Sequence, residues 1–344
     1  SAGNHALALA WHGRRLGIPV TVVMPRFAPL IKVATCRRLG AQVVTHGASF
    51  ADARAHADQL AAEHGLTYVH GFDDPAVIDG QGTLGLEVLE QVPDMDAVLV
   101  PVGGAGLIAG VATAVKTARP GVHVIGVEPA RMPSFAAALA AGRPVAVPVQ
   151  PTLADGLAVE RVGARAFAAA RDRVDRVVAV EEADLALAVL RLIELEKAVV
   201  EGAGAAPLAA LLSGQLDELR GKTVVLPLCG GNIDPAILHR VIEHGMVADG
   251  RLHRLEAWIS DRPGGLAAFA AALSDAGASI QDLRHDRAFA GPDVARVRLH
   301  AVVETRDHRH FAEVCALLTR RAAKGDWQLQ SPANSTGPLP PTRG

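Results

Sequence analysis

The sequence that decides the fold is AVLVPVGGAGLIAG, which spans residues 97–110. Its first five residues form an apolar run typical of a buried parallel strand, and a helical pattern restarts at about Leu107. The turn Gly103-Gly104-Ala105-Gly106 lies between them, so backbone N–H groups converge where the helix dipole favours an anion. Such a turn predicts either a phosphate seat or a plain strand-to-helix connection, and alone it favours neither.

The spacing of these glycines narrows the choice of phosphate ligand. The turn lacks the GxGxxG pattern of a dinucleotide fingerprint, and it lacks the GK[ST] ending of a P-loop. A phosphate bound here would therefore belong to a ligand other than NAD or ATP. The rest of the chain must indicate which ligand that is.

The composition predicts a globular, soluble protein with two or three domains. Half of the 344 residues are hydrophobic and a fifth are charged. A formal net charge of −2 without a basic tract argues against nucleic acid or an anionic membrane as a partner. We expect no membrane span and no signal peptide, because the chain has neither a long uninterrupted apolar run nor a basic leader.

The three cysteines, Cys36, Cys229 and Cys315, lie far apart and form no CxxC pair. This scattered, odd-numbered set predicts a reducing, cytoplasmic compartment and argues against a cysteine-based zinc site. Glu128 and Asp155 could face a ligand or a cation, but each is more typical of a strand end or a loop. No metal ligands are predicted.

The chain alternates helices and strands and then changes its pattern near residue 251. Residues 1–72, with a last short strand at 67–69, predict a small α/β domain, and residues 73–248 predict a larger one, both with parallel sheets. Residues 251–330 predict a small βαββαβ module. Residues 331–344 are rich in Pro, Ser, Thr and Gly and predict a disordered tail.

Several segments in a fixed order resemble the threonine/serine dehydratase family, whose members are pyridoxal-phosphate enzymes of fold type II. The opening SAGNHA, residues 1–6, resembles the family's SxGNHA motif, and FDDPAVIDGQGT, residues 72–83, matches FDDPxVIxGQGT. Residues 101–110 and 228–232 stand where the family has its phosphate loop and its ring-nitrogen loop. The module after residue 251 is similar to the ACT-type regulatory domain of one class of bacterial threonine dehydratases.

The resemblance implies pyridoxal 5′-phosphate as the cofactor. Asn4 would hydrogen-bond the phenolic oxygen of the ring, and Cys229 would face the ring nitrogen. The phosphate would sit on the backbone of Gly103, Gly104, Ala105, Gly106 and Leu107. Ala105 replaces the family's usual glycine, so its β-carbon must point away from the phosphate. Taken alone, Asn4 is also typical of a helix N-cap, and a buried cysteine is more often inert core.

The resemblance also implies the substrate site and the reaction. The substrate carboxylate would be held by the backbone of Ser1, Ala2, Gly3 and Asn4. Serine racemases of the family carry a second hydroxyl where this chain has Ala2, which cannot move a proton, so elimination is favoured over racemisation. We therefore expect conversion of L-threonine to 2-oxobutanoate and ammonia, with serine as a second substrate to consider. The alternatives are a serine dehydratase or racemase, and a non-catalytic amino-acid sensor.

The family's Schiff-base lysine precedes the SxGNHA motif. None of the lysines here stands in that context; they are Lys32, Lys116, Lys197, Lys222 and Lys324. We therefore expect an N-terminally truncated chain that does not catalyse as written. The resemblance further implies a homo-oligomer in which the last module binds an amino-acid effector near residues 261–266, DRPGGL. That stretch is equally typical of a plain β-to-α turn.

Overall fold

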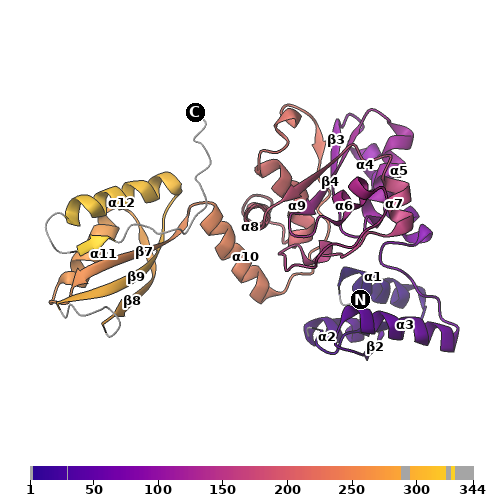
Figure 1. The fold of residues 1–344 in the computed structure, drawn as a ribbon, viewed down its shortest axis with the longest axis horizontal. Coiled ribbons are helices and arrows are strands. Elements are labelled where there is room, and N and C mark those ends of the chain that lie inside the picture. Colours follow the sequence, from indigo (N-terminus) through magenta and orange to yellow (C-terminus); the bar gives the residue numbers. More distant parts are fainter. Residues whose placement is uncertain (1–2, 29, 288–294, 323–326, 330–344) are drawn as a thin grey trace. The chain divides into compact units, whose positions relative to one another are not determined.

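The computed structural model describes residues 3–28, 30–287, 295–322 and 327–329. The chain divides into two compact units, Ser1–Val241 and Ile242–Gly344, and each is described by itself (Figure 1). Ser1, Ala2 and the predicted disordered tail lie outside the described residues. Within the described part of the chain, no helix has the length and apolar character that crossing a membrane requires.

The first unit begins with a small α/β layer. A two-stranded parallel sheet packs with three helices around a core that includes Ala6, Met24 and Cys36. Its elements are α1 (Asn4–Leu16), β1 (Thr21–Met24), α2 (Leu30–Arg38), β2 (Gln42–Thr45) and α3 (Phe50–His64). The strand predicted at residues 67–69 is wrong: the carbonyl of Val69 accepts a hydrogen bond from the His5 ring at 3.0 Å, and no strand pairs there.

A four-stranded parallel sheet in the order β5-β4-β3-β6 forms the centre of the first unit. Its strands are β3 (Ala97–Pro101), β4 (His123–Pro129), β5 (Arg176–Val180) and β6 (Val224–Val225). All five residues of β3 are buried, because alternate side chains enter two different cores. Leu99 packs with one core, whereas Val98 and Val100 pack with the other. This two-faced burial confirms the predicted α/β class with parallel sheets.

Helices cover both faces of this central sheet (Figure 1). One core contains residues of α8 (Glu182–Arg191) and α9 (Gly202–Leu212). The other contains residues of α4 (Pro75–Gln91), α5 (Gly106–Ala118), α6 (Ser134–Ala141) and α7 (Ala164–Ala170). The remaining elements are the 3₁₀ turns η1 (Asp155–Leu157) and η3 (Asp217–Leu219) and the π-helical turn η2 (Leu192–Glu196).

The second unit contains the predicted βαββαβ order. Helix α10 (Pro235–Ala248) runs across the boundary between the two units. The module then consists of β7 (Leu252–Ser260), α11 (Gly265–Asp275), β8 (Ser279–Asp286), β9 (Arg296–Glu304), α12 (His308–Ala322) and β10 (Trp327–Leu329). The strands form an antiparallel sheet in the order β10-β7-β9-β8, whose core includes Leu299, Phe269 and Leu318.

Candidate active site

The turn between β3 and α5 lies at the carboxyl end of the central strand and contains a run of backbone N–H groups without acceptors in the described chain. None of the backbone N–H groups of residues 103–107 has a hydrogen-bond acceptor within the described chain. The first N–H groups of a helix lack partners inside that helix, and buried ones require another acceptor. Gly104, Ala105 and Gly106 are buried. The turn therefore fits an anionic group such as a phosphate.

Gly104 and Gly106 are required because Phe72 packs directly against the turn. A β-carbon on Gly104 would stand 2.2 Å from the Phe72 ring, and one on Gly106 would stand 2.6 Å from the Phe72 carbonyl oxygen. The adjacent Asp73 carboxylate accepts the first N–H groups of α7, including that of Arg165 at 2.8 Å. The FDDP segment thus supports the turn and fixes the helix beside it.

Ala105 adopts a left-handed conformation, with φ of 72°, at the N-cap position of α5. Its side chain is 2% exposed and belongs to the core that contains Ile78 and Ile108. The methyl group therefore packs into the protein interior. The departure from glycine at this position adds backbone strain to the turn.

Asn4 is brought to the large α/β layer by the start of α1. The N-cap of α1 is Gly3, so the interpretation of Asn4 as a helix cap is wrong. Its amide nitrogen instead donates to Oε1 of Glu201 at 2.6 Å, across 197 residues of sequence. Asn4 is therefore tied to the first residues of α9.

The Cys229 loop meets Asn4 and Glu201 at Gly230. A β-carbon on Gly230 would stand 2.3 Å from Oε1 of Glu201 and 3.0 Å from Nδ2 of Asn4. The backbone N–H of Glu201 donates to the Gly230 carbonyl at 3.2 Å. Burial, followed by the nearby Glu201 carboxylate, raises the pKa of the Cys229 thiol. The raised pKa favours the neutral form of the Cys229 thiol.

Sequence reasoning missed Glu201. The signal that could have found it is the run EGAG, residues 201–204, in which both glycines permit close approach. A β-carbon on Gly204 would stand 2.0 Å from the Cys229 carbonyl oxygen, and one on Gly202 would stand 2.3 Å from that of Leu153. Two loops therefore press against the start of α9.

Three lysines lie in other surroundings. Lys116 pairs with Asp175 at 2.7 Å and Lys222 with Asp96 at 3.9 Å, beside a cavity of about 460 Å³ at the amino ends of the strands. The ammonium of Lys197 donates to its own helix end, at the carbonyl of Glu194. Lys32 is half-buried, and its charge acts on Glu201. Lys324 lies outside the described residues.

Glu128 and Asp155 have different surroundings. Glu128 is fully buried and accepts the N–H groups of Phe135 and Ala136 at 2.6 and 2.9 Å, so it anchors the start of α6. Burial raises the pKa of Glu128 to about 7. Asp155 begins η1, and its charge acts on Glu201. Across the described ranges, no group of three or more His, Cys, Asp or Glu side chains could hold a metal ion.

Residues 1–230 match the model of a family described as pyridoxal-phosphate dependent enzyme. The chain belongs to this family. Membership explains the anion-binding turn, because the cofactor of these enzymes carries a phosphate. It also confirms the predicted cofactor and the resemblance to fold type II enzymes.

This pyridoxal-phosphate enzyme is similar to proteins named L-threonine ammonia-lyase and threonine deaminase, and also to a serine racemase. The L-threonine ammonia-lyase of Geobacter sulfurreducens is 47% identical over 318 residues, which cover 92% of this chain and 79% of the relative. The solved threonine deaminase isoform 2 of Solanum lycopersicum is 39% identical with a TM-score of 0.68 and covers 71% of each chain. The serine racemase of Dictyostelium discoideum is 32% identical with a TM-score of 0.64, covering 68% of this chain and 75% of that one.

Proposed function

We propose that this chain is a pyridoxal-phosphate dependent threonine ammonia-lyase, which converts L-threonine to 2-oxobutanoate and ammonia. The observation that carries the proposal is the anion-binding turn at residues 103–107, which lies at the same end of the parallel sheet as the Cys229 loop. The threonine ammonia-lyase relative at 47% identity supports threonine as the substrate. Serine is the second amino acid to test.

Each group of site residues has a separate role in binding the cofactor or the substrate. The N–H groups of residues 103–107 bind the phosphate and hold the ring in place. Asn4, whose amide nitrogen also donates to Glu201, would donate to the phenolic oxygen, and the Cys229 thiol would face the ring nitrogen without supplying a charge. When bound, the cofactor supplies an electron sink for the electrons left on Cα after proton removal. The backbone of Ser1, Ala2, Gly3 and Asn4 orients the substrate carboxylate.

The lysine that holds the cofactor is part of the same proposal. Lys116 and Lys222 are engaged at the opposite end of the strands, and Lys197 is bonded to its own helix end. Neither Lys32 nor Lys324 stands in the sequence context of the family's Schiff-base lysine. From the family resemblance we propose that the cofactor-binding lysine precedes the SxGNHA motif, and every assay uses an enzyme that carries it.

A product assay separates the three candidate functions. The enzyme is incubated with L-threonine and with L-serine, and the 2-oxo acid, ammonia and D-amino acid are measured. Equal amounts of 2-oxobutanoate and ammonia, without D-amino acid, support the lyase. D-serine as the main product would support the racemase, which the lack of a hydroxyl on Ala2 argues against. Cofactor binding without any product would support the amino-acid sensor.

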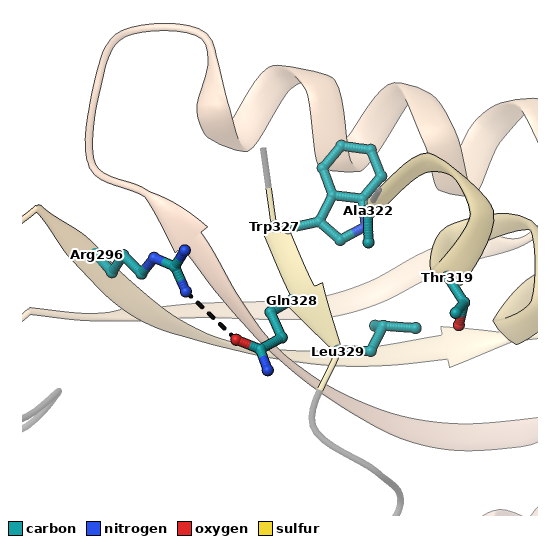
Figure 2. A pocket seen from close by; sticks show the side chains of 6 residues that line it. All are labelled: Arg296, Thr319, Ala322, Trp327, Gln328 and Leu329. Carbon is teal, nitrogen blue, oxygen red and sulfur yellow. Dashed lines mark hydrogen bonds between the residues drawn. The ribbon is translucent and has the colours of Figure 1, made fainter. Parts of the chain in front are cut away.

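The second unit is proposed to be an ACT-like regulatory module that binds an amino-acid effector in a cytoplasmic homo-oligomer. In the loop at 261–266, the Asp261 carboxylate accepts from Arg287 at 3.0 Å. A cavity of about 320 Å³ is lined in part by Arg296 and Gln328 (Figure 2). It lies at the same end of the sheet, because Arg296 pairs with Ser260 of β7. Its lining is Arg296, Thr319, Ala322, Trp327, Gln328 and Leu329. Calorimetric titration with the twenty amino acids tests this role, and binding of none would reject it.

A further inference from the structure

Glu201 occupies the N-cap position of α9, but its side chain does not cap that helix. Asp, Asn, Ser and Thr are the residues that favour this position, because their short side chains reach back to the helix N–H groups. Glu201 is only 5% exposed, and burying a carboxyl group is costly unless hydrogen bonds compensate. The Glu201 side chain therefore has a role other than capping α9.

The carboxylate of Glu201 joins segments that are far apart in sequence. Oε1 accepts the side-chain N–H of Asn4 at 2.6 Å, and a β-carbon on Gly230 would stand 2.3 Å from the same oxygen. A carboxylate can only accept from an amide nitrogen, so this contact fixes which way the Asn4 amide points. One N–H faces Glu201, and the second N–H of the same nitrogen remains for a ligand.

The backbone around Glu201 is shaped to permit this contact. The π-helical turn η2 precedes it, and Lys197 then adopts a left-handed φ of 55°. Gly230 has φ of 90° and leaves open the space that a β-carbon would fill between Glu201 and Asn4. π-helical turns and left-handed non-glycine residues are costly and gather at functional sites.

We propose that Glu201 is a positioning residue for the cofactor: it holds the Asn4 amide so that the second N–H meets the phenolic oxygen. This inference rests on the proposed cofactor site and adds a residue to it. Glu201 touches neither the substrate nor the ring in this role. It acts through Asn4.

Several neighbouring groups affect the pKa of the Glu201 carboxyl. Burial raises the pKa of the carboxyl, and the nearby Asp155 raises it further, whereas the N–H donors of Asn4 and Asn232 and the charge of Lys32 lower it. The Cys229 thiol is a further titratable group near Glu201, and the Glu201 charge raises its pKa. Replacing the carboxyl therefore alters the field at the ring as well as the hydrogen bonds.

The test compares Glu201→Gln with Asn4→Ala and with the double variant. Glutamine replaces the charged acceptor by a neutral amide, so the bond that holds Asn4 weakens and the cofactor dissociation constant rises about tenfold. The double variant binds the cofactor no more weakly than Asn4→Ala alone, because the effect passes through Asn4. The pH dependence of the bound cofactor's visible absorbance also shifts in Glu201→Gln, which loss of fold stability alone would not cause.

Two controls separate positioning from general damage. Gly230→Ala intrudes on the Glu201–Asn4 contact and reproduces the weaker binding, whereas Gly221→Ala, with φ of 76° and open space around it, adds only left-handed strain. Glu128→Gln removes a different buried carboxyl, which accepts the N–H groups of Phe135 and Ala136, and leaves the absorbance profile unchanged.

Wild-type cofactor affinity and an unchanged absorbance profile in Glu201→Gln would overturn the inference while leaving the proposed lyase intact. A wild-type enzyme that binds no cofactor would overturn both.

Discussion

Replacing Gly104 by alanine tests the fit between the phosphate turn and the FDDP segment. The new β-carbon would stand 2.2 to 2.4 Å from three atoms of the Phe72 ring. Carbon atoms in good contact are about 3.5–4.0 Å apart, so the ring or the turn must move by more than about 1 Å. Overpacking of this kind costs about 1–3 kcal/mol.

This overpacking would distort the turn whose N–H groups bind the phosphate. If the turn moves, the cofactor dissociation constant rises by about 5-fold to 150-fold, since about 1.4 kcal/mol corresponds to a factor of ten. We expect Gly104→Ala to weaken cofactor binding, measured by titration of visible absorbance. Phe72→Ala in the same chain then restores part of the affinity, because it removes the ring that the methyl group meets.

Gly121→Ala is the matched control, because nothing lies within 4 Å of its added β-carbon. It should bind the cofactor as the wild type does. Wild-type affinity in Gly104→Ala, or no recovery with Phe72→Ala, would refute the packing argument.

Three further predictions concern single side chains. Ala105→Gly should change the free energy of unfolding by less than about 0.5 kcal/mol, because relief of left-handed strain offsets the loss of the buried methyl group. Ala109→Gly, inside α5, should lower the free energy of unfolding by about 2 kcal/mol. Denaturant titration measures both variants. Asp73→Ala should lower the free energy of unfolding by about 1–2 kcal/mol, since three N–H groups of α7 lose their acceptor; an unchanged urea midpoint would contradict this. The pKa of Glu128 is raised from 4.5 to about 7, so the folded state binds a proton more tightly than the unfolded state. The contribution of this group to the free energy of unfolding is therefore full below pH 4.5 and declines as the pH rises to about 7. Glu128→Gln should reduce the dependence of the free energy of unfolding on pH in this range.

The central strand and its turn could be predicted from sequence because their signals are local. Five apolar residues followed by glycines indicate a buried strand and a tight turn whatever lies around them. The βαββαβ order was likewise visible, because residues of β7 and β9 alternate between buried and exposed positions. Local patterning therefore predicted the sheets and the location of the phosphate turn.

The missed features depend on distant partners. Residues 67–69 have strand-like character, but a strand needs a neighbour to pair with, and the backbone of Val69 bonds to a histidine ring instead. Residues 192–196 continue the helical pattern of α8, so the π-helical turn was not visible. The run EGAG could have marked the close packing around Glu201, but its contact with Asn4 forms only when folding brings together residues 197 positions apart.

The most direct test of the account compares pyridoxal phosphate with pyridoxal, which lacks the phosphate, in equilibrium binding to the enzyme. Hydrogen bonds to a charged group contribute about 1.5–3 kcal/mol each. With several N–H groups of residues 103–107 bound to the phosphate, pyridoxal should bind at least about 100-fold more weakly. Equal affinities for the two ligands would contradict the assignment of this turn as the phosphate site.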